Sequence, residues 1–401
     1  MVNIPNKLMY NPQNGLNLTG GSYLRNVQDK RKLSKKKYQN LANNLGNDVF
    51  NLYTIKPLAL YDVHDFENSE YLQNPDNNYV LLPANVIANQ WVDVCKWWND
   101  FLKKSRFRLT VASIGAQVPL NYISPENFAK DLCDEVKKFV YEIADRSISI
   151  GVRGEYTGDV LKALGIKNVD VIGCPSWFVN GINQVDVVKK DWSYDFKVSC
   201  FSSGSWLKGK QYLIKEALKY TDPKFIIQQE YDIIPYYFLN NDIYIYIRRY
   251  FRNLDYFRAA KILKDEYGIS MKDQFFNSKV RKLFEFFLDV DEWSRFAKTR
   301  DLAFGTRIHG AIVHLKQGVP TLLFVHDMRL LEIAEFFKIP YIRWDKIDIT
   351  KLDIRELYEK TDFSEMNKAY LPLYENYKAF IHKNGINFVD DTLATQENSG
   401  V

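Results

Sequence analysis

The chain has 401 residues, which is more than one hydrophobic core usually supports and therefore favours two domains. Its 54 basic and 49 acidic residues leave a formal net charge of only +5, which is too balanced to indicate a nucleic-acid-binding protein. The first 30 residues are polar and lack the apolar core of a signal peptide, and nowhere do about 18 apolar residues follow one another. We therefore expect a cytoplasmic protein with no nucleic-acid partner and no transmembrane helix.

The cysteines predict neither disulfides nor a metal site. The chain has four of them, Cys95, Cys133, Cys174 and Cys200, with no Cys-x-x-Cys pair and no histidine at metal-ligand spacing. Cys133 falls on an apolar helical stripe and is expected in the core. We expect reduced cysteines, no metal and no cofactor.

In the first half of the chain, short apolar runs alternate with helical patterns. This alternation is typical of a doubly wound α/β sheet. The expected strands are 79–82, 108–114, 148–152 and 169–172, and the expected helices are 89–102, 127–144 and 156–164. Gly165 follows the last of these helices and is expected to end it in the left-handed conformation.

The same alternation restarts after a turn predicted at residues 180–183. The expected strands are 196–201, 224–227, 302–304, 321–325 and 341–342, and the expected helices are 208–219, 256–266, 280–289, 293–298, 307–316 and 328–336. We predict α/β architecture with two Rossmann-like domains facing each other across a cleft. The predicted boundaries are 1–185 for the first domain, 186–380 for the second and 381–401 for a tail.

The segment from Asp301 to Gly310 runs from an apolar strand into a helix and places Arg307 and His309 where that helix begins. A helix start is already electropositive, so two basic residues there have the wrong sign unless they hold an anion. Backbone N–H groups, an arginine fork and an imidazole together suit a phosphate or a carboxylate. The alternative is that Arg307 pairs with a nearby acid and His309 is a satisfied, half-buried residue.

Other segments also fall at the carboxyl ends of expected strands, where open α/β sheets bind ligands. These are 115–117, 173–176 and 305–307, while 202–205 either contributes loop N–H groups or is a plain linker. No Gly-x-Gly-x-x-Gly, no P-loop and no Gly-x-Ser-x-Gly elbow occurs, so neither a nucleotide fold nor a Ser-His-Asp hydrolase is indicated.

Residues 243–252 combine a strand-like alternation of Ile and Tyr with three arginines. If exposed, this segment would suit an anionic membrane surface, at the inner face of the membrane. If buried, it is a helix with snorkelling arginines or part of a substrate-binding surface.

Several of these motifs together resemble the polysaccharide pyruvyl transferase family, over roughly residues 40 to 340. The strongest match is Gly305-Thr306-Arg307-Ile308-His309-Gly310 followed by Gly318-Val319-Pro320. The remaining matches are 149–156 with its Val-Arg strand end, 173–176, 113–117, the pair Asp327 and Arg329, and 44–48, which carries one residue more than the Asn-x-Gly-Asp of the family.

The resemblance implies a fold similar to that of two-domain (GT-B-like) glycosyltransferases. It also implies transfer of pyruvate from phosphoenolpyruvate to a sugar diol as a ketal, with release of phosphate. The acceptor would be a sugar or a lipid-linked oligosaccharide. The implied catalytic residues are His309 and Arg307, and the implied donor-binding residues are Thr306, Arg307, His309, Gly310, Arg153 and Ser203. Residues proposed for the acceptor or a secondary role are Asn44, Asp48, Gln117, Glu230, His326 and Arg329.

Two other functions remain open at this stage. The first is a glycosyltransferase of the same architecture that binds the diphosphate of a nucleotide-sugar at Arg307 and His309. The second is a non-catalytic, glycan-binding relative. Pairing of both Arg307 and His309 with acids inside the protein would favour the non-catalytic relative.

Overall fold

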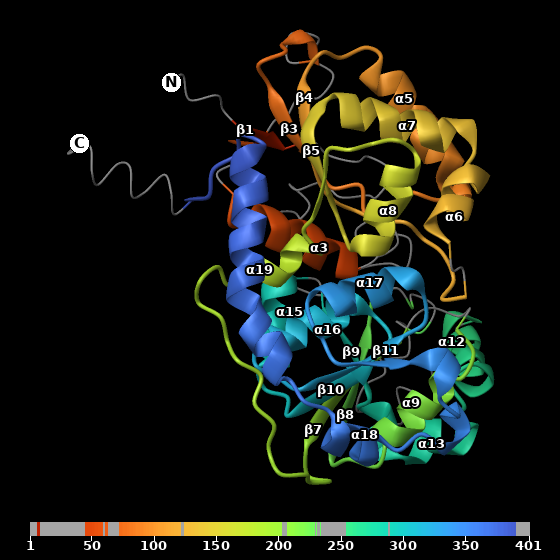
Figure 1. Cartoon of the computed structure of the whole chain (residues 1–401). Coiled ribbons are helices and arrows are strands. Elements are labelled where there is room, and N and C mark those ends of the chain that lie inside the picture. The colour runs from red at the N-terminus through yellow and green to blue at the C-terminus, as the bar shows by residue number, and fades with distance from the viewer. Residues whose placement is uncertain are drawn as a thin grey trace.

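The computed structural model contains two parallel β-sheets of six strands each, with helices around them (Figure 1). It describes residues 6–8, 45–58, 61–62, 72–121, 124–202, 207–228, 230, 233, 254–287 and 289–389. The two sheets lie one above the other, and helices α3 (Leu45–Ile55), α8 (Glu155–Ala163), α16 (Ile308–Leu315) and α17 (Met328–Phe336) lie between them. The α/β prediction is confirmed.

The first sheet has the strand order β2-β1-β3-β4-β5-β6, and all its neighbouring strands are parallel. Its core is built from alternating buried residues of the strands and from the apolar faces of α8 and of two further helices, α5 (Val92–Leu102) and α7 (Asp134–Asp145). The strands are β1 (Asn6–Leu8), β2 (Tyr61–Asp62), β3 (Asn78–Leu81), β4 (Arg108–Ile114), β5 (Ser147–Val152) and β6 (Val169–Val171). The other helices are η3 (Asn89–Trp91), α6 (Pro125–Asp131) and η4 (Pro175–Phe178).

The second sheet has the order β12-β11-β10-β7-β8-β9, again with parallel neighbours. The order reverses between β7 (Lys197–Phe201) and β10 (Leu302–Gly305), as in a Rossmann sheet. The other strands are β8 (Asp222–Ile227), β9 (Phe284–Phe286), β11 (Thr321–Val325) and β12 (Tyr341–Arg343). The other helices are α9 (Lys210–Ala217), α12 (Leu254–Asp265), α13 (Met271–Phe276), α14 (Ser278–Arg281), α15 (Val290–Ala297), η6 (Trp344–Lys346), η7 (Ile349–Lys351) and α18 (Ile354–Lys360).

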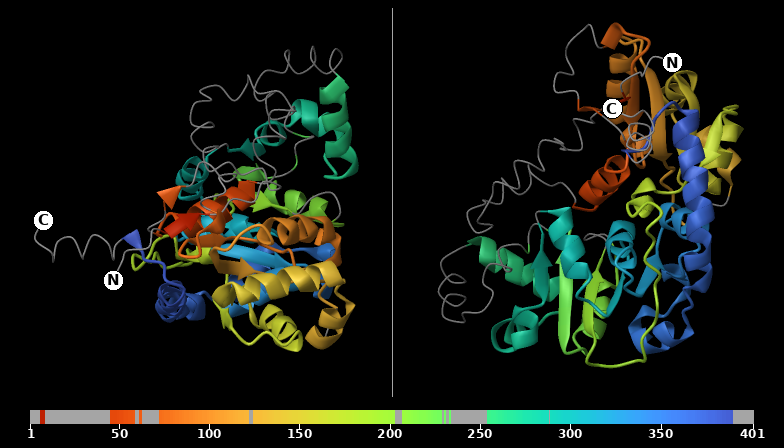
Figure 2. Two further views of the ribbon diagram at one scale, coloured as in Figure 1. Left: turned by 90° about the horizontal axis from the view of Figure 1, so that it is seen from above. Right: turned by 90° about the vertical axis from the view of Figure 1, so that its left-hand side faces the viewer.

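The long helix α19 (Ser364–Lys383) runs along one side of the molecule beside both sheets (Figures 1 and 2). Its C-terminal half contacts the first sheet, because Asn376 Nδ2 donates to Val171 O at 2.9 Å and Lys383 Nζ pairs with Asp170 at 2.8 Å. The C-terminal half of α19 therefore lies beside strands that precede residue 185, although the predicted boundaries assign the helix as far as residue 380 to the second domain. Those boundaries, the cleft and the GT-B-like likeness stay predictions.

Several local expectations are confirmed. Strand β4 has the predicted bounds, Gly165 has φ +85° after α8, and the turn at 180–183 is closed by the N–H of Asn183, which donates to Asn180 O. No helix in the described ranges is both long and apolar enough to cross a membrane.

Three expectations are wrong. The helix predicted at 280–289 is the short α14 followed by strand β9, because the Phe-rich run at 284–286 pairs with β8 at the sheet edge. A short apolar run of this kind fits a strand and a helix equally well. The helix predicted at 127–144 is interrupted at Cys133, whose N–H donates to the side chain of Asn89, and Cys133 is only half-buried rather than in the core.

Candidate active site

Several of the predicted site residues directly follow the carboxyl ends of strands in both sheets. Arg153 directly follows β5, and Cys174 follows β6 in the first sheet. Arg307 follows β10 and His326 follows β11 in the second sheet. The two groups lie close together, because Cys174 Sγ lies 3.7 Å from Nε2 of His309, which is in the helix that follows Arg307. Ligands of open α/β sheets bind at these strand ends.

Arg153 is a fully buried arginine that forms no ion pair with any described residue. Its side chain is 2% exposed, and its Nε donates to the carbonyl and hydroxyl oxygens of Ser113 at 3.0 and 3.1 Å. Its Nη1 donates to the side-chain oxygen of Asn85, and its Nη2 has no hydrogen-bond partner among the described residues. Burial lowers the pKa of Arg153 to about 10, so the guanidinium remains charged at neutral pH. Buried charges are normally paired or hydrogen-bonded, so Nη2 leaves a donor of this buried charge available to an anion.

The backbone around Arg153 is shaped to accept this side chain. Ser113 has φ +64° and Ala84, next to Asn85, has φ +55°, a region that non-glycine residues rarely adopt. A Cβ on Gly115 would lie 2.8 Å from Arg153 Cδ, so only glycine leaves room there. The ring of Phe50, on α3, lies 5.2 Å from the guanidinium carbon and completes the enclosure by a cation–π contact.

Arg307 lies at the topological switch point of the second sheet and is paired. Its Nε donates to Ser202 O, just after β7, and its Nη2 forms an ion pair with Glu230 at 2.8 Å. Both side chains are nearly buried, with 11% and 5% of their surfaces exposed. Arg307 thus holds the loop ends after β7 and β8 against β10. A ligand bound there would share the guanidinium group of Arg307 with Glu230.

The two glycines that flank this motif serve packing. A Cβ on Gly305 would lie 1.9 Å from Phe201 O, and one on Gly310 would lie 2.9 Å from the Phe201 ring. The close approach of α16 to β7 requires glycine at position 310, and the role of Gly310 in donor binding stays a prediction. Thr306, which directly follows Gly305, is buried, and its N–H donates to Phe201 O at 3.1 Å.

His309, in the first turn of α16, is surrounded by cations and a thiol. Its ring stacks on Phe50 with centroids 5.8 Å apart, and its Nε2 lies 3.7 Å from Cys174 Sγ. Burial lowers the pKa of His309 well below 6.5, and the charges of Arg153, Arg329 and Arg307 lower it further. The imidazole is therefore neutral at neutral pH. Burial also raises the pKa of the Cys174 thiol, so both partners are uncharged.

Arg329 and Asp327 form a second charged pair of the site, at the start of α17. Arg329 Nη2 lies 3.0 Å from Asp327 Oδ2, while Asp327 Oδ1 accepts from the N–H of Leu330 and caps the helix. Arg329 Nε is buried without a hydrogen-bond partner among the described residues. His326 Nδ1 lies 3.8 Å from Asp327, and burial lowers the pKa of His326 to about 4.

Comparison with known proteins shows to which family this chain belongs. The sequence profile of the polysaccharide pyruvyl transferases matches residues 44–328, which is more than half of the chain. The chain belongs to this family.

A solved structure from Klebsiella pneumoniae subsp. pneumoniae NTUH-K2044, of a functionally uncharacterised protein, is similar at 12% identity. The match covers 75% of this chain and 89% of that one, with a TM-score of 0.38. No curated protein matches the chain.

The remaining predicted residues of this pyruvyl transferase family member lie in different surroundings. Asp48 is in the first turn of α3, and burial raises its pKa to about 7. Gln117 follows β4, and its side-chain oxygen accepts from Trp91 Nε1 at 3.2 Å. Asn44, Ser203 and segment 243–252 lie outside the described residues. No group of three or more His, Cys, Asp or Glu in the described ranges is arranged to hold a metal ion.

The sequence indicated no role in the site for Asn85, Phe50 or Glu332, and it included Ser113 only within the family-like segment 113–117. Asn85 and Ser113 hold the Arg153 fork, Phe50 contacts both Arg153 and His309, and Glu332 joins the two sheets. Cys174 was recognised only as part of a strand-end segment. These side chains are ordinary residues in loops and helices, and their roles depend on contacts between distant parts of the chain.

Proposed function

We propose that this protein transfers pyruvate from phosphoenolpyruvate to a sugar diol as a cyclic ketal and releases phosphate. The observation that carries the proposal is the buried guanidinium of Arg153, which forms no ion pair among the described residues and whose charge, like those of Arg307 and Arg329, lowers the pKa of His309. Phosphoenolpyruvate has a phosphate and a carboxylate, and arginine forks bind both groups in a bidentate manner. Family membership supports a transferase that acts in polysaccharide synthesis.

The arrangement also suits the proposed chemistry. One sugar hydroxyl adds to the carbon of phosphoenolpyruvate that carries the phosphate, while the methylene carbon accepts a proton. Phosphate then leaves with the bonding electron pair, and the neighbouring hydroxyl closes the ketal. Of the two protons that the hydroxyls lose, one accounts for the proton gained by the methylene carbon, which becomes a methyl group. The other leaves with phosphate or solvent. In this scheme neutral His309 acts as the base toward a hydroxyl, and the arginines stabilise the departing phosphate.

One contact favours a different reading. Arg307 is paired with Glu230, as expected for a glycan-binding relative without activity. His309, however, contacts Cys174 and Phe50 and forms no pair with an acid in the described part of the chain. In a non-catalytic relative, both Arg307 and His309 are expected to pair with acids. The pyruvyl transferase therefore remains the better-supported proposal.

Ligand-dependent thermal unfolding tests the proposal. A ligand at about 100 times its dissociation constant should add roughly 2.7 kcal/mol to the free energy of unfolding. We expect phosphoenolpyruvate to stabilise the wild-type protein more than pyruvate, inorganic phosphate or nucleotide-sugars do. Stabilisation by a nucleotide-sugar, with none by phosphoenolpyruvate, would contradict the pyruvyl transferase and favour a glycosyltransferase.

A further inference from the structure

Helix α8 begins without a capping side chain of its own and takes one from the other sheet. Its N-cap is Gly154, and the N–H of Thr157 donates instead to Glu332 Oε2 at 3.0 Å. The hydroxyl of Thr157 donates to Glu332 Oε1 at 2.9 Å and accepts from the N–H of Ala116 at 2.9 Å. Glu332 belongs to α17, which follows a strand of the second sheet, so this chain of bonds crosses from one sheet to the other.

The two helices approach so closely that a side chain at Gly154 would not fit. A Cβ there would lie 2.5 Å from Glu332 Cβ and 3.0 Å from Glu332 O. Gly154 has φ −172°, an extended conformation open to any residue, so its requirement is space rather than backbone freedom. The contact between α8 and α17 is thus built for a fixed separation.

A carboxylate is a costly way to hold two surfaces together. Glu332 is 4% exposed, and burial of a carboxylate is unfavourable unless its oxygens are hydrogen-bonded. Adhesion between the two halves is already supplied by aromatic contacts, such as Trp177 on Phe337 with ring centroids 5.1 Å apart. What two directed hydrogen bonds add is a defined position of one helix against the other.

That position matters for the cationic groups. Arg153 immediately precedes Gly154 at the start of α8, and Arg329 lies one helical turn before Glu332 on α17. Any shift of α8 against α17 changes the separation between the arginine of the first sheet and those of the second. An anion held by both sheets binds only when that separation fits.

We propose that Glu332, through Thr157, is an inter-sheet latch that sets the separation of Arg153 from Arg307 and Arg329 and thereby the affinity for the anionic donor. This inference rests on the proposed function only in naming phosphoenolpyruvate as that donor. Glu332 is a positioning residue, because it acts through the helices and touches neither the donor nor the reacting atoms.

A double-mutant cycle tests the latch. We expect Glu332→Gln and Thr157→Val each to weaken the binding of phosphoenolpyruvate roughly tenfold, within the range of coupling between sites. The double variant should lose no more than either single variant, because both disrupt the same hydrogen bond between the Thr157 hydroxyl and the Glu332 side chain. Thr157→Ser retains the hydroxyl and should restore wild-type affinity. Glu335→Gln removes an exposed charge from the same helix and should have no effect.

A second measurement keeps the outcomes separate. Small-angle X-ray scattering of the ligand-free variants should show a larger radius of gyration for Glu332→Gln and Thr157→Val than for Glu335→Gln. Additive losses of affinity, or wild-type affinity in both single variants, would overturn the latch, as would lower stability with unchanged affinity. If the wild-type protein binds no phosphoenolpyruvate, the proposed function fails. The latch is then judged by scattering alone, and an unchanged radius of gyration overturns it.

Discussion

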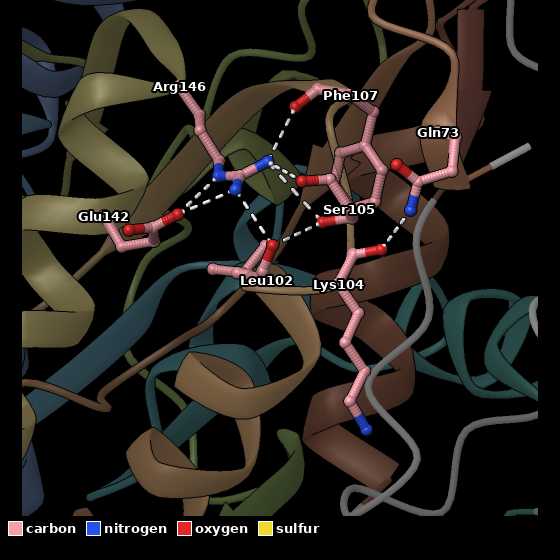
Figure 3. Close-up of polar contacts among 7 residues, drawn as sticks. All are labelled: Gln73, Leu102, Lys104, Ser105, Phe107, Glu142 and Arg146. Carbon is pink, nitrogen blue, oxygen red and sulfur yellow. Dashed lines mark hydrogen bonds and ion pairs between the residues drawn. The ribbon is translucent and has the colours of Figure 1, made fainter. Parts of the chain in front are cut away.

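Strand β5 has an arginine just before it and another just after it, and their surroundings differ. At the amino end, Arg146 forms an ion pair with Glu142 at 2.7 Å and donates to the carbonyl oxygens of Leu102, Ser105 and Phe107 (Figure 3). At the carboxyl end, Arg153 meets only the neutral oxygens of Ser113 and Asn85, and its Nη2 has no partner among the described residues.

Arg146 therefore serves the fold, whereas the ligand-binding role of Arg153 is part of the proposed function. Arg146 ties α5 and α7 to the strand, and its charge is compensated inside the protein. Arg153 is more deeply buried and its charge is compensated less, which is unfavourable in the ligand-free protein. Sequence position alone does not distinguish the two, because both flank the same strand.

Among variants at the carboxyl ends of the strands, the largest expected effect is a loss of catalytic turnover. His309→Gln should lower turnover about 10²–10⁴-fold, the usual contribution of a general acid or base. Affinity for phosphoenolpyruvate should change little, because the neutral imidazole does not supply the positive charge of the site. Steady-state kinetics and calorimetric titration on one protein sample check both statements. A fall in affinity with unchanged turnover would make His309 a clamp, and proportionate losses of stability and activity would make it structural.

The two arginines should respond in opposite ways to the same substitution. Arg153→Met should weaken phosphoenolpyruvate binding about 100-fold, the value of a buried charged hydrogen-bond pair. Arg146→Met should leave binding unchanged but lower the free energy of unfolding by about 2 kcal/mol, because buried carbonyl groups lose their donor. Urea unfolding and titration calorimetry measure the two quantities. Equal effects of both variants on stability, with no effect on binding, would remove Arg153 from the donor site.

Arg307 lies between these two cases, because it is paired and also lies at the switch point of the second sheet. Arg307→Lys keeps the charge but loses the planar fork, so we expect donor affinity to fall roughly tenfold, about one charged hydrogen bond. The fold should survive, as monitored by circular dichroism. An unchanged Michaelis constant for phosphoenolpyruvate would mean that Arg307 serves only to pair with Glu230.

The stability of the protein should also depend on pH through Glu332. Burial raises the pKa of Glu332 from 4.5 to about 7, with Asp327 raising it and Arg153 and the Thr157 bonds lowering it. Between pH 4.5 and 7 the folded chain therefore holds a proton that the unfolded chain has lost. The contribution of Glu332 is fully present below pH 4.5 and declines as the pH rises to about 7, by at most about 1.4 kcal/mol per pH unit.

Glu332→Gln should lack this slope, and Glu335→Gln should keep it. Thermal unfolding of the three proteins between pH 4.5 and 8 measures the difference. Parallel pH profiles for wild type and Glu332→Gln would show that the carboxyl group is not buried as described.

The sequence predicted what depends on local pattern. Alternation of apolar runs gave the bounds of β4, and Arg307 and His309 were placed at the start of a helix that begins at Ile308. The pairing of Arg307 with Glu230 was foreseen only as a general alternative. Strand β9 was missed because a Phe-rich run has no distinct period.

Other features could not be predicted because they depend on tertiary contacts. The unpaired state of Arg153 follows from which side chains surround it after folding, and nothing in the segment around it shows that an acid is absent. The contacts of Cys174 with His309 and of Thr157 with Glu332 join residues 135 and 175 positions apart. The switch point between β7 and β10 requires the strand order, which local patterns do not contain.

The central claim is that the unbalanced charge of Arg153 is present for an anionic donor. A crystal structure of the protein with phosphoenolpyruvate tests it most directly. We predict that a phosphate or carboxylate oxygen of the ligand lies within hydrogen-bond distance of Arg153 Nη2, with His309 and Arg307 on the opposite side. A ligand bound elsewhere, with Nη2 still without a partner, would contradict the claim.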